Sequence, residues 1–217
     1  MSLVFAPGFA LMISKPLLAG RLLDHLRRVH GVEAAHPVCC KHEPGLSSGT
    51  RVINVCPGCD RRYRELYAGV STVSLWEILA GDEEFPFPDY GGAVMTILDA
   101  CPTRTETRFH EAVRAILTRM NIRVVEPRQT RTHGICCGDS LYGLVPVEEV
   151  KAAMKKRAGE MPADEVAVYC VSCVKSMHLG GRKPRHLVDL LFGESTDAGT
   201  FDPDAWHAEL QDYIDRH

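Results

Sequence analysis

Nine cysteines fall into two sets that share one order, and this repeat constrains the fold more than any other feature of the sequence. In each set an adjacent pair is followed by a C-x-x-C, which reads "CPGC" in the first set and "CVSC" in the second. The members are Cys39, Cys40, Cys56 and Cys59 in the first set, and Cys101, Cys136, Cys137, Cys170 and Cys173 in the second. A shared order that covers most of the chain indicates an internal duplication.

The segments around the cysteines repeat in the same order. In the second half, residues 94–101 and 165–170 are apolar runs that predict buried strands, and residues 105–122 have the apolar spacing of an amphipathic helix. In the first half, residues 3–9 and 50–56 predict the matching strands. Strands that alternate with helices form parallel sheets. We therefore predict an α/β fold of two pseudo-repeated halves, each a small, mostly parallel sheet flanked by helices.

The two halves are not equal. Phe9 stands where the second half has Cys101, and the first half has 15 residues between its cysteine pair and its C-x-x-C, against 32 in the second. The first half therefore lacks the helix that we expect in this interval of the second half. A segment rich in Pro and Gly, residues 85–92, predicts the boundary. We assign a degenerate half to residues 1–88 and a complete half with a C-terminal helix to residues 89–217.

Three cysteines follow predicted strands directly, namely Cys56, Cys101 and Cys170. Parallel sheets bind their ligands at the carboxyl ends of their strands, so we expect a metal site at that end of each half. Adjacent cysteines can hardly form a relaxed disulfide with each other. In a reducing compartment, clustered cysteines are more often metal ligands or redox groups than disulfides.

The composition excludes several classes of function. A formal net charge of −3 lacks the excess of positive charge that nucleic-acid binding requires, so we expect no nucleic-acid partner. No apolar run approaches the roughly 20 residues of a membrane-spanning helix, so we expect no direct membrane insertion. The N-terminus lacks the basic segment and cleavage site of a signal peptide, which favours a cytoplasmic location.

Five cysteines in one half exceed the needs of the common metal sites. A structural zinc ion takes four ligands, and cubane clusters also take four, often from a tight cysteine run that is absent here. Adjacent Cys136 and Cys137 could bind two neighbouring irons, and Gly138 could let the backbone approach an inorganic cluster closely. Zinc, a simpler cluster or a purely structural role remain alternatives at this point.

The arrangement of Cys101, Cys136-Cys137-Gly138 and Cys170-x-x-Cys173 resembles the cysteine-rich CCG-domain family, best known from heterodisulfide reductase. The family has two such domains in tandem, and the resemblance covers the whole chain in order. It implies that a non-cubane [4Fe-4S] cluster is held by Cys101, Cys136, Cys137, Cys170 and Cys173. It also implies electron transfer, or reduction of a disulfide or thiol substrate, at that cluster, with no separate catalytic residue identified.

The first half departs from the family pattern, since Phe9 replaces the lone cysteine and Lys41 replaces the glycine. Four thiols remain, with His36 and His42 nearby, and four thiolates suffice for zinc or for a smaller cluster. The candidate ligands there are Cys39, Cys40, Cys56 and Cys59. An empty, relict site is the competing interpretation.

The sequence contains no dinucleotide fingerprint and no ferredoxin-type run, so a redox role requires an electron-donating flavin or iron–sulfur subunit as partner. A non-catalytic, zinc-stabilised adaptor subunit of a larger redox complex is the alternative. A cysteine-nucleophile enzyme is a third hypothesis, but no catalytic base is evident. His133 and His178 flank the second set, and we expect both to be solvated.

Overall fold

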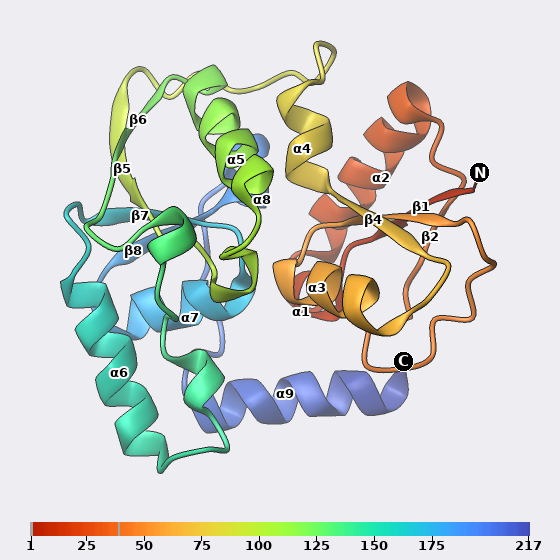
Figure 1. Ribbon diagram of the computed structural model, residues 1–217. Helices are drawn as coiled ribbons and strands as arrows, with labels where there is room; N and C mark the ends of the chain where they lie inside the picture. The colour runs from red at the N-terminus through yellow and green to blue at the C-terminus, as the bar shows by residue number, and fades with distance from the viewer. Residues whose placement is uncertain (1, 39) are drawn as a thin grey trace. The chain divides into compact units, whose positions relative to one another are not determined.

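The computed structural model describes residues 2–38 and 40–217, which form two compact units (Figure 1). The first unit runs to Pro86 and includes Leu210–His217, and the second comprises Phe87–Glu209. This division lies two residues before the boundary expected from the sequence. The last part of the C-terminal helix, from Leu210 onward, belongs to the first unit.

Each unit contains a four-stranded sheet in which all strands are parallel, so the predicted α/β fold of two repeated halves is confirmed. The first sheet has the order β2-β1-β3-β4 and the second has the equivalent order β6-β5-β7-β8. The strands of the first sheet are β1 Leu3–Ala6, β2 Ala34–Ala35, β3 Arg51–Asn54 and β4 Ser71–Ser74. Those of the second are β5 Ala93–Ile97, β6 Ile122–Val125, β7 Glu165–Val168 and β8 Lys183–His186.

Helices form the crossovers that parallel strands require. The first unit has α1 Phe9–Ser14, α2 Pro16–His30, α3 Pro57–Leu66 and α4 Leu75–Ala80. The second has α5 Thr107–Arg119, α6 Val147–Gly159, α7 Val171–Leu179 and α8 Leu187–Leu191, and α9 Pro203–Arg216 completes the chain. In the described part of the first unit α6 has no helical counterpart, in agreement with the shorter cysteine spacing. Within residues 2–38 and 40–217, no helix has both the length and the apolar character needed to cross a bilayer.

Strand register identifies the residues that correspond between the two units. When Cys56 is aligned with Cys170, Ile53 of β3 corresponds to Ala167 of β7. Their partners in the neighbouring strands are Phe5 of β1 and Ile97 of β5, which are therefore equivalent. Four residues later, the chain reaches Phe9 in the first unit and Cys101 in the second. Phe9 therefore stands at the position in the first unit that the lone Cys101 occupies in the second.

The ends of the helices follow ordinary capping chemistry. Helix α2 is capped at its C-terminal end by Gly31, whose left-handed φ of 67° suits a residue without a side chain. Ser74 and His186 occupy equivalent positions, and each accepts a hydrogen bond at the start of the helix that follows it, α4 or α8. These matched caps are a further trace of the duplication.

Candidate metal centre

The five cysteines predicted as ligands in the second half come together at the carboxyl end of its sheet. Cys101 opens a 3₁₀ turn four residues beyond β5, and Cys170 and Cys173 lie at the start of α7, directly after β7. Cys136 and Cys137 come from the loop between β6 and α6. None of the eight described cysteines forms a disulfide. Three segments far apart in sequence thus supply free thiols to one place.

The five side chains interact in an unbroken sequence, from Cys101 through Cys136, Cys137 and Cys173 to Cys170. Hydrogen bonds from Cys101 and Cys137 hold the pKa of Cys136 far below its usual range. The same contacts raise the pKa of the two donors, since each must keep its proton to donate. One thiolate among several thiols is a site prepared for a cation, because a metal displaces the remaining thiol protons.

Two further groups stabilise the Cys136 thiolate. The Ser140 hydroxyl donates to its Sγ over 2.9 Å, and the backbone N–H of Gly138 donates over 3.4 Å. Both donors come from the turn that follows the cysteine pair. Hydrogen bonds of this kind persist when a thiolate binds a metal and tune its electron-donating strength.

The thiols differ in exposure. Cys137 and Cys173 are buried, whereas Cys101, Cys136 and Cys170 are partly exposed. The group therefore has a closed side within the unit and an open side accessible to solvent. A metal centre held here could meet a small substrate or an electron donor on the open side.

Gly138 is required by packing against α6. Its φ is +111°, and a Cβ on it would lie 2.9 Å from both the backbone N and the Cγ of Met154. The sequence suggested that this glycine admits an inorganic cluster, and the structure gives it a different neighbour. The Ser176 hydroxyl fixes the adjacent segment by donating to the Cys137 carbonyl over 2.6 Å.

A single buried carboxylate, Asp99, joins the segments that carry the cysteines. It accepts hydrogen bonds from Arg114 (2.9 and 3.2 Å), Thr130 (2.8 Å), the backbone N–H of Arg131 (2.7 Å) and the Tyr169 hydroxyl (3.1 Å). Its side chain is only 1% exposed. Burial by itself would raise the pKa of Asp99, but the Arg114 guanidinium and the other donors lower it to about 2. Asp99 is therefore an anion at neutral pH.

The position of Tyr169, one residue before Cys170, extends this network to the turn that begins at Cys101. Its hydroxyl accepts from the backbone N–H of Ala100 (2.9 Å) and contacts the Thr103 hydroxyl (3.0 Å). Thr103 in turn contacts His110 Nε2 over 3.1 Å. The backbone on both sides of the thiol group is thus cross-linked by buried polar side chains.

The first unit brings together three of its four predicted ligands, Cys40, Cys56 and Cys59, while Cys39 lies outside the described residues. Hydrogen bonding to Cys40 and Cys56 raises the pKa of Cys59. A Cβ on Gly8, whose φ is +79°, would lie 3.1 Å from the Cys56 Cβ. The chain therefore approaches this C-x-x-C closely one residue before Phe9, the position equivalent to the lone Cys101.

The surroundings of the first site are more apolar. Phe9 packs against a core cluster that includes Cys40 and Cys59. His36 is buried, burial lowers its pKa, and its Nε2 has no hydrogen-bond partner among the described residues. His42 contacts the carbonyl of Ile214 over 2.8 Å.

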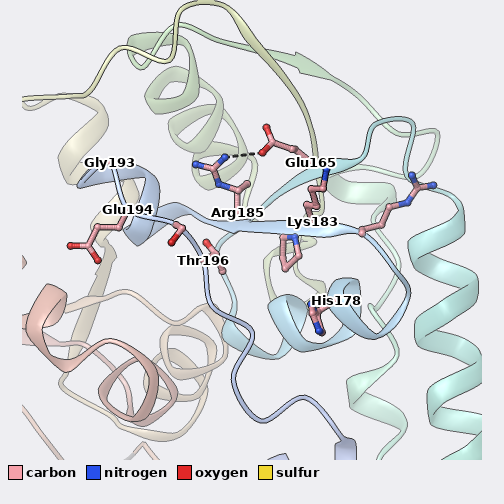
Figure 2. A pocket seen from close by; sticks show the side chains of 10 residues that line it. Glu165, His178, Lys183, Arg185, Gly193, Glu194 and Thr196 are labelled. Carbon is pink, nitrogen blue, oxygen red and sulfur yellow. Dashed lines mark hydrogen bonds and ion pairs between the residues drawn. The ribbon is translucent and has the colours of Figure 1, made fainter.

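The flanking histidines of the second set are exposed, as we expected. His133 contacts the neighbouring Thr132 hydroxyl, and the ring of His178 packs edge-on against Phe201. His178 also lines a surface hollow of about 490 Å³ along β8 (Figure 2). None of the described cysteines lines this hollow, and Figure 2 shows its Arg185 turned toward Glu165, with which it forms a 2.8 Å ion pair. The hollow is therefore separate from the thiol group.

The comparisons with known proteins give no family. No family model matches this chain, and no curated protein matches it significantly. The function must therefore be argued from the chemistry of the thiol groups.

Proposed function

We propose that this chain is an iron–sulfur redox protein, similar to the CCG-domain component of heterodisulfide reductase, which works as part of a larger complex. The observation that carries the proposal is the convergence of five free thiols from three distant segments. The proposed cluster ligands are Cys101, Cys136, Cys137, Cys170 and Cys173. A thiolate-held cluster also fits the reducing cytoplasm, where we propose that the protein resides.

The number of the thiols and the contacts between them favour a cluster over a single zinc ion. A structural zinc ion takes four ligands, so the five thiols of the second unit are more than one zinc ion can use. Five thiols that contact one another in turn, from Cys101 to Cys170, suit a group of several irons, because each of the five sulfurs can then bind iron.

The protein side chains have distinct roles in this proposal. Cys137 and Cys173 anchor the closed side, while Cys101, Cys136 and Cys170 hold the side that faces solvent. When bound, an iron–sulfur cluster supplies one-electron transfer and an iron on which substrate sulfur can be bound. Ser140 and Gly138 hold negative charge on the Cys136 sulfur, and Asp99 keeps the three segments in register.

The substrate that this site favours is a small disulfide or thiol adduct, approached from the open side. The electron donor would be a flavin or iron–sulfur subunit, because the sequence offers no dinucleotide fingerprint of its own. We assign zinc or a smaller cluster to Cys39, Cys40, Cys56 and Cys59. Phe9 takes the position of the fifth thiol there, so the working cluster belongs to the second unit.

The test is a redox assay on the chain purified without oxygen. Viologen reduced beforehand serves as donor, and consumption of a small organic disulfide is followed together with the electron paramagnetic resonance spectrum. We expect a paramagnetic signal and disulfide-dependent oxidation of the donor, both lost in Cys136→Ser. The matched control is Cys56→Ser, the partly exposed one of the three cysteines described in the first unit, which should keep the disulfide-dependent oxidation of the donor and the signal of the second-unit cluster. A colourless, zinc-containing protein without either property would favour the adaptor function instead.

A further inference from the structure

Two histidines and an aspartate form a second type of ligand group, in the first unit and without any cysteine. His25 and His30 lie on α2, and Asp82 follows α4. The two Nε2 atoms lie 2.6 and 2.8 Å from the same Oδ2 of Asp82, and the three atoms are all within 4.8 Å of one another. Side-chain exposure is 9% for His25, 26% for His30 and 1% for Asp82.

The carboxylate of this group is held firmly in place. Its other oxygen, Oδ1, accepts hydrogen bonds from the backbone N–H groups of Glu84 (2.8 Å) and Phe85 (3.1 Å). The Phe85 ring packs edge-on against the imidazole of His25, with centroids 4.9 Å apart. Oδ2 is therefore presented to both imidazoles by the backbone, which is the kind of support that orients metal ligands in proteins.

The position at the end of a helix favours a cation. His30 is the last residue of α2, where the unpaired carbonyl groups give the helix terminus a partial negative charge. Two imidazoles and one carboxylate are ligands that zinc and similar divalent ions prefer. Ligand atoms around a tetrahedral ion of this type lie about 3.3 Å apart, so each N···O contact needs to lengthen by roughly 0.5 to 0.7 Å.

We propose that His25, His30 and Asp82 bind a divalent transition-metal ion of the zinc type, separately from the cysteine sites. The ion would join the C-terminal end of α2 to the turn after α4. Two imidazole nitrogens and one carboxylate oxygen leave a fourth position on the more exposed side of His30 for water. The site is independent of the iron–sulfur function proposed above.

Arg28 opposes metal binding and so offers a sharp test. Its Nη2 lies 3.3 Å from the Nδ1 of His25, which makes Nδ1 the acceptor and Nε2 the protonated nitrogen. When Nε2 binds a metal, the ring proton moves to Nδ1, and Arg28 must turn away. Its side chain is 60% exposed and pairs with Glu84 in solvent, so it is able to move. Removing Arg28 should therefore strengthen metal binding, because a positive charge and a competing donor both disappear.

The experiment titrates Co²⁺ into the full-length chain and follows the visible absorption of the bound ion. Nitrogen and oxygen ligands give ligand-field bands without the sulfur-to-cobalt charge-transfer band of the cysteine sites. We expect one such site per chain in the wild type, at least tenfold weaker in His30→Gln, which keeps a donor to Asp82 but loses the imidazole. Arg28→Ala should bind several-fold more tightly, and Arg27→Ala, which removes the same charge from an exposed position of α2, should leave the affinity unchanged.

The proposal is overturned if His30→Gln binds as much cobalt as the wild type with the same affinity and the same ligand-field bands. An equal affinity in Arg28→Ala and Arg27→Ala also contradicts it. His30 is partly exposed, so His30→Gln should keep the fold, which its thermal melting curve without metal verifies. Asp82→Asn is a second variant that should also lose the site.

Discussion

The buried anion Asp99 allows a quantitative prediction, because all of its partners are donors. Replacement by Asn keeps the shape but removes the charge and puts an NH₂ group among the hydrogens of Arg114, Thr130, Arg131 and Tyr169. Breaking a buried ion pair typically costs about 3–5 kcal/mol. Arg114 retains Glu126 at 2.6 Å, so we expect a loss near the lower end, about 3 kcal/mol. That is a large part of the roughly 5–15 kcal/mol by which a domain is stable.

The assay is urea unfolding of the metal-free chain, in which the midpoint and slope give the free energy of unfolding. Glu126→Gln is the matched control, since Glu126 pairs with the same arginine but its side chain is 38% exposed. We expect that control to cost about 1 kcal/mol or less, as for other exposed pairs. If Asp99→Asn costs no more than Glu126→Gln, Asp99 does not organise the segments that carry the cysteines.

Three further predictions concern the same unit. Gly138→Ala should destabilise the chain by roughly 2–4 kcal/mol and lower its iron content, because its Cβ would overlap Met154 at a left-handed φ. In Gly159→Ala the added Cβ meets nothing within 4 Å, so thermal melting should show no loss of stability for that control and iron analysis should show an unchanged iron content. Ser140→Ala should lower the reduction potential in a redox titration followed by paramagnetic resonance, because Cys136 loses a hydrogen bond; an unchanged potential would contradict this role. Hydrogen bonding from Arg114 lowers the pKa of Glu126 in the folded chain. The ionised Glu126 side chain therefore contributes to stability at a pH above the ordinary glutamate pKa. This contribution is lost as the pH falls through the lowered pKa of the folded chain. The difference in unfolding free energy between wild type and Glu126→Gln should accordingly shrink from pH 7 to pH 3, and a difference that grows would refute the sign.

The parallel sheets and their repeat can be predicted because cysteine order and apolar runs are local patterns. Strands β4 and β8 escape such prediction, since "STVS" and "KPRH" contain few apolar residues and β8 holds Pro184 at a sheet edge. The helices α3 and α7 that begin at each C-x-x-C escape it as well. A short apolar strand running into a helix has no single period that a sequence pattern can reveal.

The side chains that support the candidate site cannot be predicted from the sequence. Asp99 stands in the apolar run of residues 94–101, which hints at its burial, but it contacts residues 15 to 70 positions away that no local pattern identifies. His25, His30 and Asp82 are likewise brought together by packing across 57 residues. The positions of Cys101 and Cys170 follow from strand ends, whereas those of Cys136 and Cys137 and the hydrogen-bonding partners of all five thiols depend on the folded loops.

The central claim is that the second unit holds an iron–sulfur cluster, and metal analysis tests it most directly. Iron, zinc and acid-labile sulfide are measured per chain on protein purified without oxygen, for the wild type and for Cys136→Ser. We predict about four irons with matching sulfide in the second unit of each wild-type chain, and loss of that iron and sulfide in the variant. Zinc alone, without sulfide and without uptake of iron and sulfide on reconstitution, would contradict the claim and favour the adaptor function.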